Sequence, residues 1–182
     1  MSGEGKPSRN GLSDTPHRVV KMFMEYTEGF HEDPREHLKK QFEVDSEDLI
    51  LVKDIPFVSL CEHHFAPFYG VAHVAYIPGK NSLTGKPVIT GLSKIGRVVQ
   101  GYAKRFQVQE GLTNDIAQAM EDVLHPKGVV VVLEAAHTCM CLRGLKATGA
   151  VTMTSSIKGV FKESQSARNE VLSLINAPSR VK

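Results

Sequence analysis

The sequence contains no tryptophan, only three cysteines, and no apolar run near the roughly 20 residues of a membrane-spanning helix. The cysteine count is odd and lacks the spacing of small secreted domains, which argues against a disulfide framework. Lys and Arg total 22 against 20 Asp and Glu, and this net charge of +2 gives no support to nucleic-acid binding. The first residues also lack the apolar core of a signal peptide. We therefore expect a soluble, cytoplasmic protein whose partners are neither nucleic acid nor membrane.

The composition is that of an ordinary globular protein. Apolar residues make up 41% of the 182 positions and charged residues 23%, a balance that argues against disorder. Residues 1–13 are rich in Gly, Ser, Lys and Pro and predict a flexible leader. Residues 14–182 are short enough to form one domain.

Helical periodicity appears in several segments. Apolar residues recur at helical spacing over residues 14–28, 93–106, 112–123 and around 171–175. The segment Asp14-Thr15-Pro16, with a capping side chain before a proline, is expected to start the first of these helices, and Ser93 to cap the second.

Four other segments predict strands, because they are rich in β-branched and aromatic residues or alternate in polarity: residues 49–60, 68–77, 129–142 and 150–161. Residues 78–91 predict a loop, and residues 29–46 a loop or a short helical piece. The order helix, strand pair, helix pair, strand pair, helix predicts an α+β fold with helices on one face of an antiparallel sheet.

One predicted strand carries an unusual set of side chains. Residues two apart share a face of a strand, so His137, Cys139, Cys141 and Arg143 are expected on one side. Two thiols, an imidazole and a guanidinium suggest chemistry on that face. The alternative is that the cysteines are small buried apolar residues, as free cysteines often are.

A second motif, Cys61-Glu62-His63-His64, favours a metal site. Cys61 and His64, together with one thiol of the later strand, would supply three ligands to zinc and leave a position for water. A closed structural site, with His137 or Cys141 as fourth ligand, stays open as an alternative. In a catalytic site His63 and His137 would serve in proton transfer, or one of them would only orient a ligand.

Three features suggest an anionic, nitrogen-rich ligand. Ser93, Lys94 and Arg97 lie at an expected helix N-terminus, which can bind an anion. Arg18 and Lys21 lie three apart on one helical face. Residues 107–110, Gln-Val-Gln-Glu, offer groups that can pair with the edge of a base. Solvated surface and a polar helix start are the competing interpretations of these features.

In this order the motifs resemble those of zinc-dependent GTP cyclohydrolase I. The similarity covers residues 12–175 and rests on six segments: residues 14–19 (DTPHRV), 59–64 (SLCEHH), 91–94 (GLSK), 107–110 (QVQE), 137–139 (HTC) and 143–144 (RG). The resemblance implies a tunnelling fold whose subunits assemble into a toroidal decamer of two pentamers, with active sites between subunits.

The resemblance also implies a role for each matching residue. Cys61, His64 and Cys139 would bind zinc, and His63 and His137 would be the acid–base pair. Glu110 and Gln109 would hold the guanine of GTP. The residues around the triphosphate and ribose would be Leu92, Ser93, Lys94, Arg97, Arg143, Arg18 and Lys21. The implied reaction converts GTP and water to 7,8-dihydroneopterin triphosphate and formate, the first step of tetrahydrofolate and pterin biosynthesis.

The sequence departs from the family pattern in four places. The leader before Leu12 is short, the loop over residues 79–90 is long, and Gly111 and Ala150 stand where Arg and Ser are usual. Cys141 is an additional thiol. A related tunnelling-fold enzyme for another pterin or purine, and a silent nucleotide- or partner-binding homologue with a structural zinc, are the alternatives. The H-x-E and P-C-x-x-C motifs of zinc nucleobase deaminases are absent from the sequence.

Overall fold

The computed structural model describes residues 9–179. Its helices are α1 (Thr15–Tyr26), the 3-10 helices η1 (Glu28–His31) and η2 (Pro34–Lys39), α2 (Leu92–Ala103), α3 (Gln109–Leu124), α4 (Thr138–Cys141), α5 (Val160–Glu163) and α6 (Gln165–Asn176). Its strands are β1 (Gln41–Glu43), β2 (Ile50–Cys61), β3 (Ala66–Ile77), β4 (Gly79–Lys80), β5 (Pro87–Thr90), β6 (Phe106–Gln107), β7 (Gly128–His137) and β8 (Thr152–Gly159). Among the described residues, no helix has the length and apolar character needed to cross a membrane.

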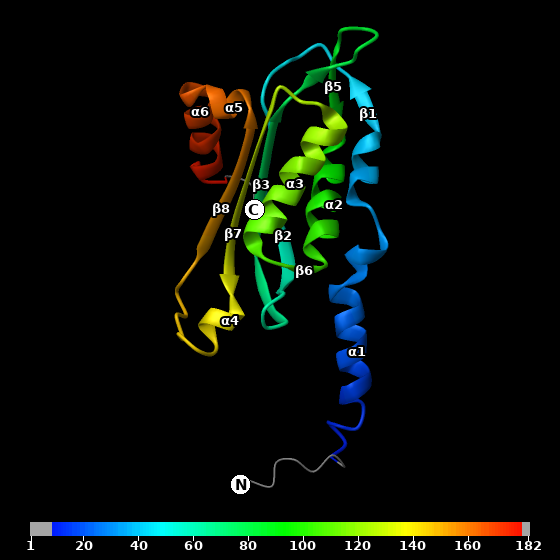
Figure 1. Cartoon of the computed structure of the whole chain (residues 1–182), viewed down its shortest axis with the longest axis vertical. Coiled ribbons are helices and arrows are strands. Elements are labelled where there is room, and N and C mark those ends of the chain that lie inside the picture. The colour runs from blue at the N-terminus through cyan, green and yellow to red at the C-terminus, as the bar shows by residue number, and fades with distance from the viewer. Residues whose placement is uncertain (1–8, 180–182) are drawn as a thin grey trace.

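The architecture is α+β, as predicted, and is built on a five-stranded sheet in the order β6-β2-β3-β7-β8 (Figure 1). All neighbouring strands in it are antiparallel except β6, which pairs with β2 in parallel. A small second sheet, β1-β5-β4, forms in segments that were expected to be loops. The parallel edge strand β6 matters for function because it brings the start of α3 beside the end of β2.

Helices cover both faces of the sheet, so the prediction of helices on one face is wrong. Alternate residues of β7 point to opposite faces. Val129 and Val131 join the larger core with α2 and α3, whereas Val130 and Val132 pack with Phe161 of α5 and with α6. The fully apolar run at the start of β7 is therefore explained by burial on both sides.

The first helix begins at Thr15, close to the predicted start, but Asp14 makes no side-chain capping bond. Its carboxylate instead accepts a hydrogen bond from Arg18 at 3.3 Å. No residue of α1 is buried within the described chain. Val20 and Met24, two of the apolar residues that recur at helical spacing in it, are 57% and 67% exposed. Figure 1 shows α1 extending away from the sheet.

Residues 1–8 of the expected leader lie outside the described part of the chain. Residues 9–14 form turns, in which the Leu12 N–H donates to the Arg9 carbonyl at 2.8 Å.

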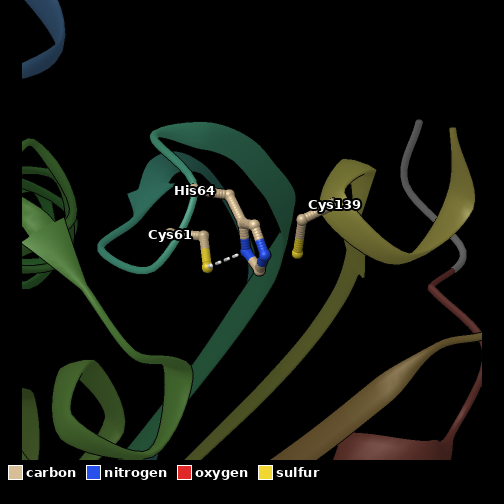
Figure 2. A group of neighbouring side chains, drawn as sticks. All are labelled: Cys61, His64 and Cys139. Carbon is tan, nitrogen blue, oxygen red and sulfur yellow. Dashed lines mark hydrogen bonds between the residues drawn. The ribbon is translucent and has the colours of Figure 1, made fainter. Parts of the chain in front are cut away.

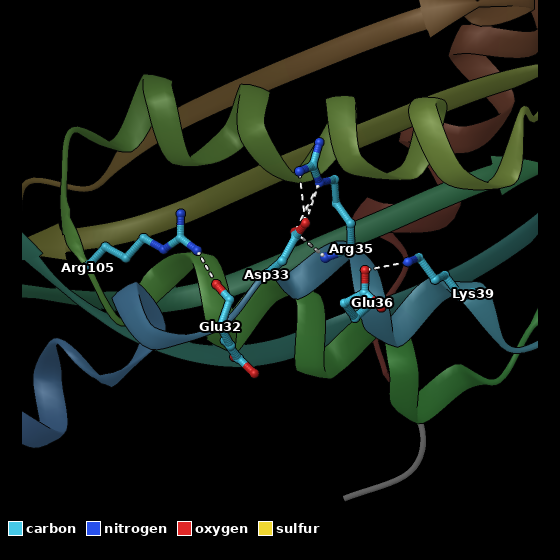
Figure 3. Close-up of polar contacts among 6 residues, drawn as sticks. All are labelled: Glu32, Asp33, Arg35, Glu36, Lys39 and Arg105. Atoms are coloured by element: carbon cyan, nitrogen blue, oxygen red, sulfur yellow. Dashed lines mark hydrogen bonds and ion pairs between the residues drawn. The ribbon is translucent and has the colours of Figure 1, made fainter.

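The segment before β1 is held by short-range charges and by Arg105 (Figure 3). Asp33 caps η2 by accepting from the Arg35 N–H and guanidinium, and this hydrogen bonding lowers the pKa of the Asp33 carboxyl. The Arg105 guanidinium donates to the carbonyl of Glu32 at 3.0 Å and to that of Gly29 at 2.9 Å. These bonds join η1 to the end of α2.

Two boundaries near the expected site differ from prediction. The second helix begins at Leu92 with Gly91 as its N-cap, so Ser93 lies inside the first turn and does not cap it. That helix ends at Ala103, and Phe106 belongs to β6.

The strand predicted over residues 129–142 ends at His137. The last residue pair between β7 and β3 is His137–Phe68. The next residue of β3 is Pro67, and a proline has no N–H with which to continue the ladder. The Thr138 hydroxyl donates to the Pro67 carbonyl at 2.6 Å, and the chain turns into α4. This ending decides the geometry of the second cysteine motif.

Candidate metal centre and active site

The turn between β2 and β3 carries the first motif. β2 ends at Cys61, which is paired with Ala66 at the start of β3. The N–H groups of His64 and Phe65 both donate to the Cys61 carbonyl, at 3.2 and 2.8 Å. Phe65 completes the tight turn with a φ of 51°, in the left-handed region that few residues other than glycine adopt. This turn brings His64 Nδ1 to 3.9 Å from Cys61 Sγ.

The turn is anchored on β6. The Phe65 ring packs against Phe106 with centroids 4.7 Å apart, and the Glu62 N–H donates to the Gln107 carbonyl at 3.1 Å. Residues that follow β6 are thereby fixed in place beside Cys61.

Cys139 reaches the same point from α4. The ligand atoms of Cys61, His64 and Cys139 all lie within 4.8 Å of one another. Figure 2 shows both sulfur atoms directed toward the imidazole of His64. Two sulfurs and one imidazole nitrogen form a donor set that suits a borderline transition-metal ion.

Cys141 is not part of this group, and the expectation of a shared strand face is wrong. Residues two apart in a helical turn lie about 200° apart around the axis, so α4 directs Cys139 and Cys141 differently. Arg143 lies beyond the end of α4 and is exposed. The cluster selects Cys139 as the third donor, which the sequence pattern by itself left open.

The protonation of Cys139 depends on what occupies the cluster. Burial raises the pKa of this thiol, and the neighbouring Cys61 thiol raises it further. A bound cation acts in the opposite direction, because the thiolate is the form that ligates metal. The residues therefore fit a metal ion both in their chemistry and in their spacing.

A cavity of about 330 Å³ opens beside the cluster. It is lined by the predicted ligands, by both predicted acid–base histidines and by the predicted guanine-binding pair, together with four further residues: Cys61, His64, Cys139, His63, His137, Gln109, Glu110, Gln107, Val108, Met140 and Thr152. Segments more than 70 residues apart in the sequence thus meet at one hollow.

His137 is held in this cavity by two contacts of its ring. Its ring stacks on Phe68, with centroids 4.6 Å apart and planes within 2°, and its Nε2 lies 2.7 Å from Gln109 Oε1. Burial lowers the pKa of His137, and the Glu110 carboxylate partly opposes that shift. His63 lies in the β2–β3 turn between Cys61 and His64, and its Nδ1 is 3.7 Å from Cys61 Sγ.

The sequence was compared with known proteins. The sequence model of the family described as GTP cyclohydrolase I matches residues 2–176. The chain belongs to the GTP cyclohydrolase I family. It is 53% identical over 171 residues to the GTP cyclohydrolase 1 of Bacillus cytotoxicus, covering 94% of this chain and 87% of that protein. It is 54% identical over 169 residues to the GTP cyclohydrolase 1 of Bacillus mycoides, covering 93% and 86%.

Among solved structures, the apo form of the archaeosine synthase QueF-Like covers 63% of this chain and 97% of its own. The TM-score is 0.47 at 19% identity, too low to add to the GTP cyclohydrolase I assignment.

The remaining residues that the GTP cyclohydrolase I resemblance selects do not line the cavity of the single chain. They are Leu92, Ser93, Lys94 and Arg97 of α2, Arg18 and Lys21 of α1, and Arg143 after α4. The side chains of Arg18 and Asp14 form an exposed ion pair at 3.3 Å. The cavity of one chain therefore combines the Cys61–His64–Cys139 cluster, two histidines and Glu110 without any of these seven residues.

Sequence reasoning missed Phe68, Thr152 and Thr154. Phe68 stacks on His137, and the Thr152 carbonyl and the Thr154 hydroxyl accept hydrogen bonds from Gln109. The alternation of threonines along β8 was a visible signal that one of its faces is polar. Nothing local in the sequence indicated that Phe68 would lie opposite His137 in the β3–β7 ladder.

Proposed function

We propose that this chain converts GTP and water to 7,8-dihydroneopterin triphosphate and formate, the first step of tetrahydrofolate and pterin biosynthesis. The observation that carries the proposal is the meeting of the Cys61–His64–Cys139 cluster with two histidines in one cavity. The family membership and the 54% identity to a protein named GTP cyclohydrolase 1 support it.

The resident metal is zinc, held by Cys61, His64 and Cys139. Thiolate and imidazole are its usual protein ligands, and sites with three such ligands are typical of catalytic zinc. Zinc bound there supplies a water of lowered pKa, and hence a nucleophile near neutral pH.

The histidines move the protons that the reaction needs. Opening the imidazole ring of guanine requires a proton on a ring nitrogen, and release of formate requires further transfers. His137 is held in a fixed orientation by Phe68, which suits it to exchange a proton with the purine. His63, on the metal-binding turn, serves the second transfer.

Glu110 holds the guanine. Its carboxylate is exposed at the start of α3 and lines the cavity, where it can accept hydrogen bonds from the N–H groups of a guanine edge. Orientation of the base by a fixed acceptor presents the imidazole ring of the substrate to the histidines.

The triphosphate and ribose are bound by a second copy of the chain. The predicted cationic residues lie outside the cavity of one chain, and α1 leaves an apolar stripe exposed. Both observations support an active site shared between subunits in the tunnelling-fold assembly, a toroidal decamer of two pentamers. The three free cysteines suit a reducing compartment and support a cytoplasmic location.

The test is incubation of the zinc-loaded protein with GTP, with separate assays for formate and for the fluorescent oxidised pterin. We expect both products in equal amounts. Zinc-loaded, correctly assembled protein that binds GTP and yields neither product would instead be a silent nucleotide-binding homologue.

A further inference from the structure

The side-chain amide of Gln109 has only one orientation that its surroundings accept. Its Nε2 lies 3.2 Å from the Leu133 carbonyl oxygen, 3.0 Å from the Thr152 carbonyl oxygen and 3.1 Å from Thr154 Oγ1. Backbone carbonyls only accept hydrogen bonds, so the group that faces them is the NH2. A flipped amide would set its oxygen against two carbonyl oxygens at a residue that is 1% exposed.

The threonine hydroxyls agree with this orientation. Thr113 Oγ1 lies 2.6 Å from the Gln109 carbonyl oxygen and 2.6 Å from Thr154 Oγ1. Because the carbonyl only accepts, the Thr113 hydroxyl donates to it, and the Thr154 hydroxyl donates to Thr113. The Thr154 oxygen is then free to accept from Gln109 Nε2, so every hydrogen bond of the network has a defined direction.

The orientation of Gln109 fixes where His137 carries its proton. Gln109 Oε1 lies 2.7 Å from His137 Nε2 and can only accept, so Nε2 is the protonated nitrogen. A neutral imidazole has one N–H, which leaves Nδ1 with its lone pair free. His137 stands at the N-cap of α4, yet its side chain makes no capping hydrogen bond. Nδ1 is therefore not engaged by the helical turn that follows.

We propose that Gln109 is a positioning residue that holds neutral His137 in its Nε2–H tautomer, so that Nδ1 is the atom at which this ring exchanges protons with the substrate. The inference rests on the proposed function and deepens it. It also replaces the expectation that the Gln109 side chain holds guanine, because the oxygen and the NH2 of this amide are both engaged within the chain. Glu110 is left as the guanine-binding member of the pair.

The first test reads the tautomer directly, by solid-state NMR of the zinc-loaded protein with ¹⁵N-labelled histidine. In a neutral ring the protonated and unprotonated nitrogens have well-separated ¹⁵N shifts, and the His137 signals are those missing from the His137→Gln variant. We expect the proton on Nε2 in the unmodified protein and a mixed or reversed tautomer in Gln109→Met. A neutral His137 with its proton on Nδ1 in the unmodified protein would overturn the proposal.

The second test separates positioning from guanine binding. Gln109→Met keeps the length of the side chain and removes its hydrogen bonds, and we expect kcat to fall on the order of 10²-fold, with KM for GTP unchanged within about twofold and zinc content unchanged. Gln118→Met, the same substitution farther along α3, is the matched control and should leave both constants unchanged. A rise in KM at constant kcat would return Gln109 to guanine binding and contradict the proposal.

The two hypotheses fail separately. If the unmodified protein does not open GTP, the proposed function is wrong, while the NMR spectrum still decides the tautomer. If Gln109→Met does not fold, the spectrum of the unmodified protein decides by itself.

Discussion

Phe68 and His137 lie face to face across the β3–β7 ladder, with ring centroids 4.6 Å apart and planes within 2°. The ladder ends at this pair, so the last register position of the sheet sets the orientation of an imidazole in the cavity. Phe68 is fully buried, and it also packs edge-on against Phe57 with centroids 6.0 Å apart. The hydrophobic core thus extends directly to the proposed acid–base residue.

Replacement of Phe68 by leucine removes the stacking surface while it keeps the site apolar. We expect kcat to fall about 10-fold, because the His137 ring gains rotational freedom, and the free energy of unfolding to fall by on the order of 1 kcal/mol. Steady-state kinetics and urea denaturation measure the two effects. Phe57→Leu, at a position that is also buried, is the control: it should lose similar stability and keep kcat. Equal kcat losses in the two variants would show that the stack has no special role.

Replacement of Cys139 by serine should remove zinc, whereas Cys141→Ser should retain one zinc per chain. The reason is the helical turn of α4, which places only Cys139 with Cys61 and His64. Metal content per folded chain, measured by inductively coupled plasma mass spectrometry after gel filtration, checks the prediction. The reverse pattern would mean that the ligand assignment is wrong.

Replacement of Glu110 by glutamine should lower kcat/KM for GTP roughly 10- to 100-fold, since a hydrogen bond to a charged group contributes about 1.5–3 kcal/mol. Inosine triphosphate lacks the 2-amino group of GTP, so the variant should discriminate less between the two nucleotides than the unmodified protein does. Equal discrimination by both proteins would argue against contact between Glu110 and the guanine edge.

The free energy of unfolding should decrease as the pH is lowered, because of the buried side chain of His73. This side chain is 6% exposed, and its Nδ1 accepts the Asp54 N–H at 3.1 Å. Burial lowers the pKa of His73, with a smaller contribution from Lys53, and the carboxylates of Asp54 and Glu134 partly oppose the shift. The folded protein therefore binds this proton less readily than the unfolded chain, whose histidine pKa is about 6.5.

By linkage, the contribution of His73 to stability is complete above pH of about 6.5 and is lost as the pH falls toward the lowered folded-state pKa. Urea denaturation of the unmodified protein and of His73→Gln at several pH values measures it. The free energy of unfolding of the unmodified protein should fall more steeply over this interval than that of the variant. Parallel slopes for the unmodified protein and His73→Gln would contradict the prediction.

The closeness of Cys61 and His64 could be predicted from local sequence pattern, because their spacing lies within one turn. The position of the later cysteines could not, because it depends on strand pairing between distant segments. The pattern by itself did not choose between Cys139 and Cys141, and only the family resemblance pointed to Cys139. Alternation over residues 137–143 does not reveal that β3 stops pairing with β7 at Phe68. The error in extending this strand is also the reason that Cys141 and Arg143 were placed beside Cys139.

The fold shows the same division. The strands over residues 50–61 and 66–77 were predicted closely because their apolar and alternating patterns are local. The placement of α6 on the opposite face depends on which sides of β7 are covered, and a run of valines is compatible with either arrangement. The helical periodicity of residues 14–28 was also local, but it did not show that α1 would have no buried residue in the described chain.

The most direct test of the account relates catalysis to the metal cluster. Protein freed of metal by a chelator under reducing conditions is titrated with zinc, and the rate of formate release from GTP is recorded against bound zinc per chain. We predict a linear rise that stops at one zinc per chain, and no rise for Cys139→Ser. A rate that is unaffected by bound zinc, or an equal rate in Cys139→Ser, would contradict the central claim that Cys61, His64 and Cys139 form the catalytic centre.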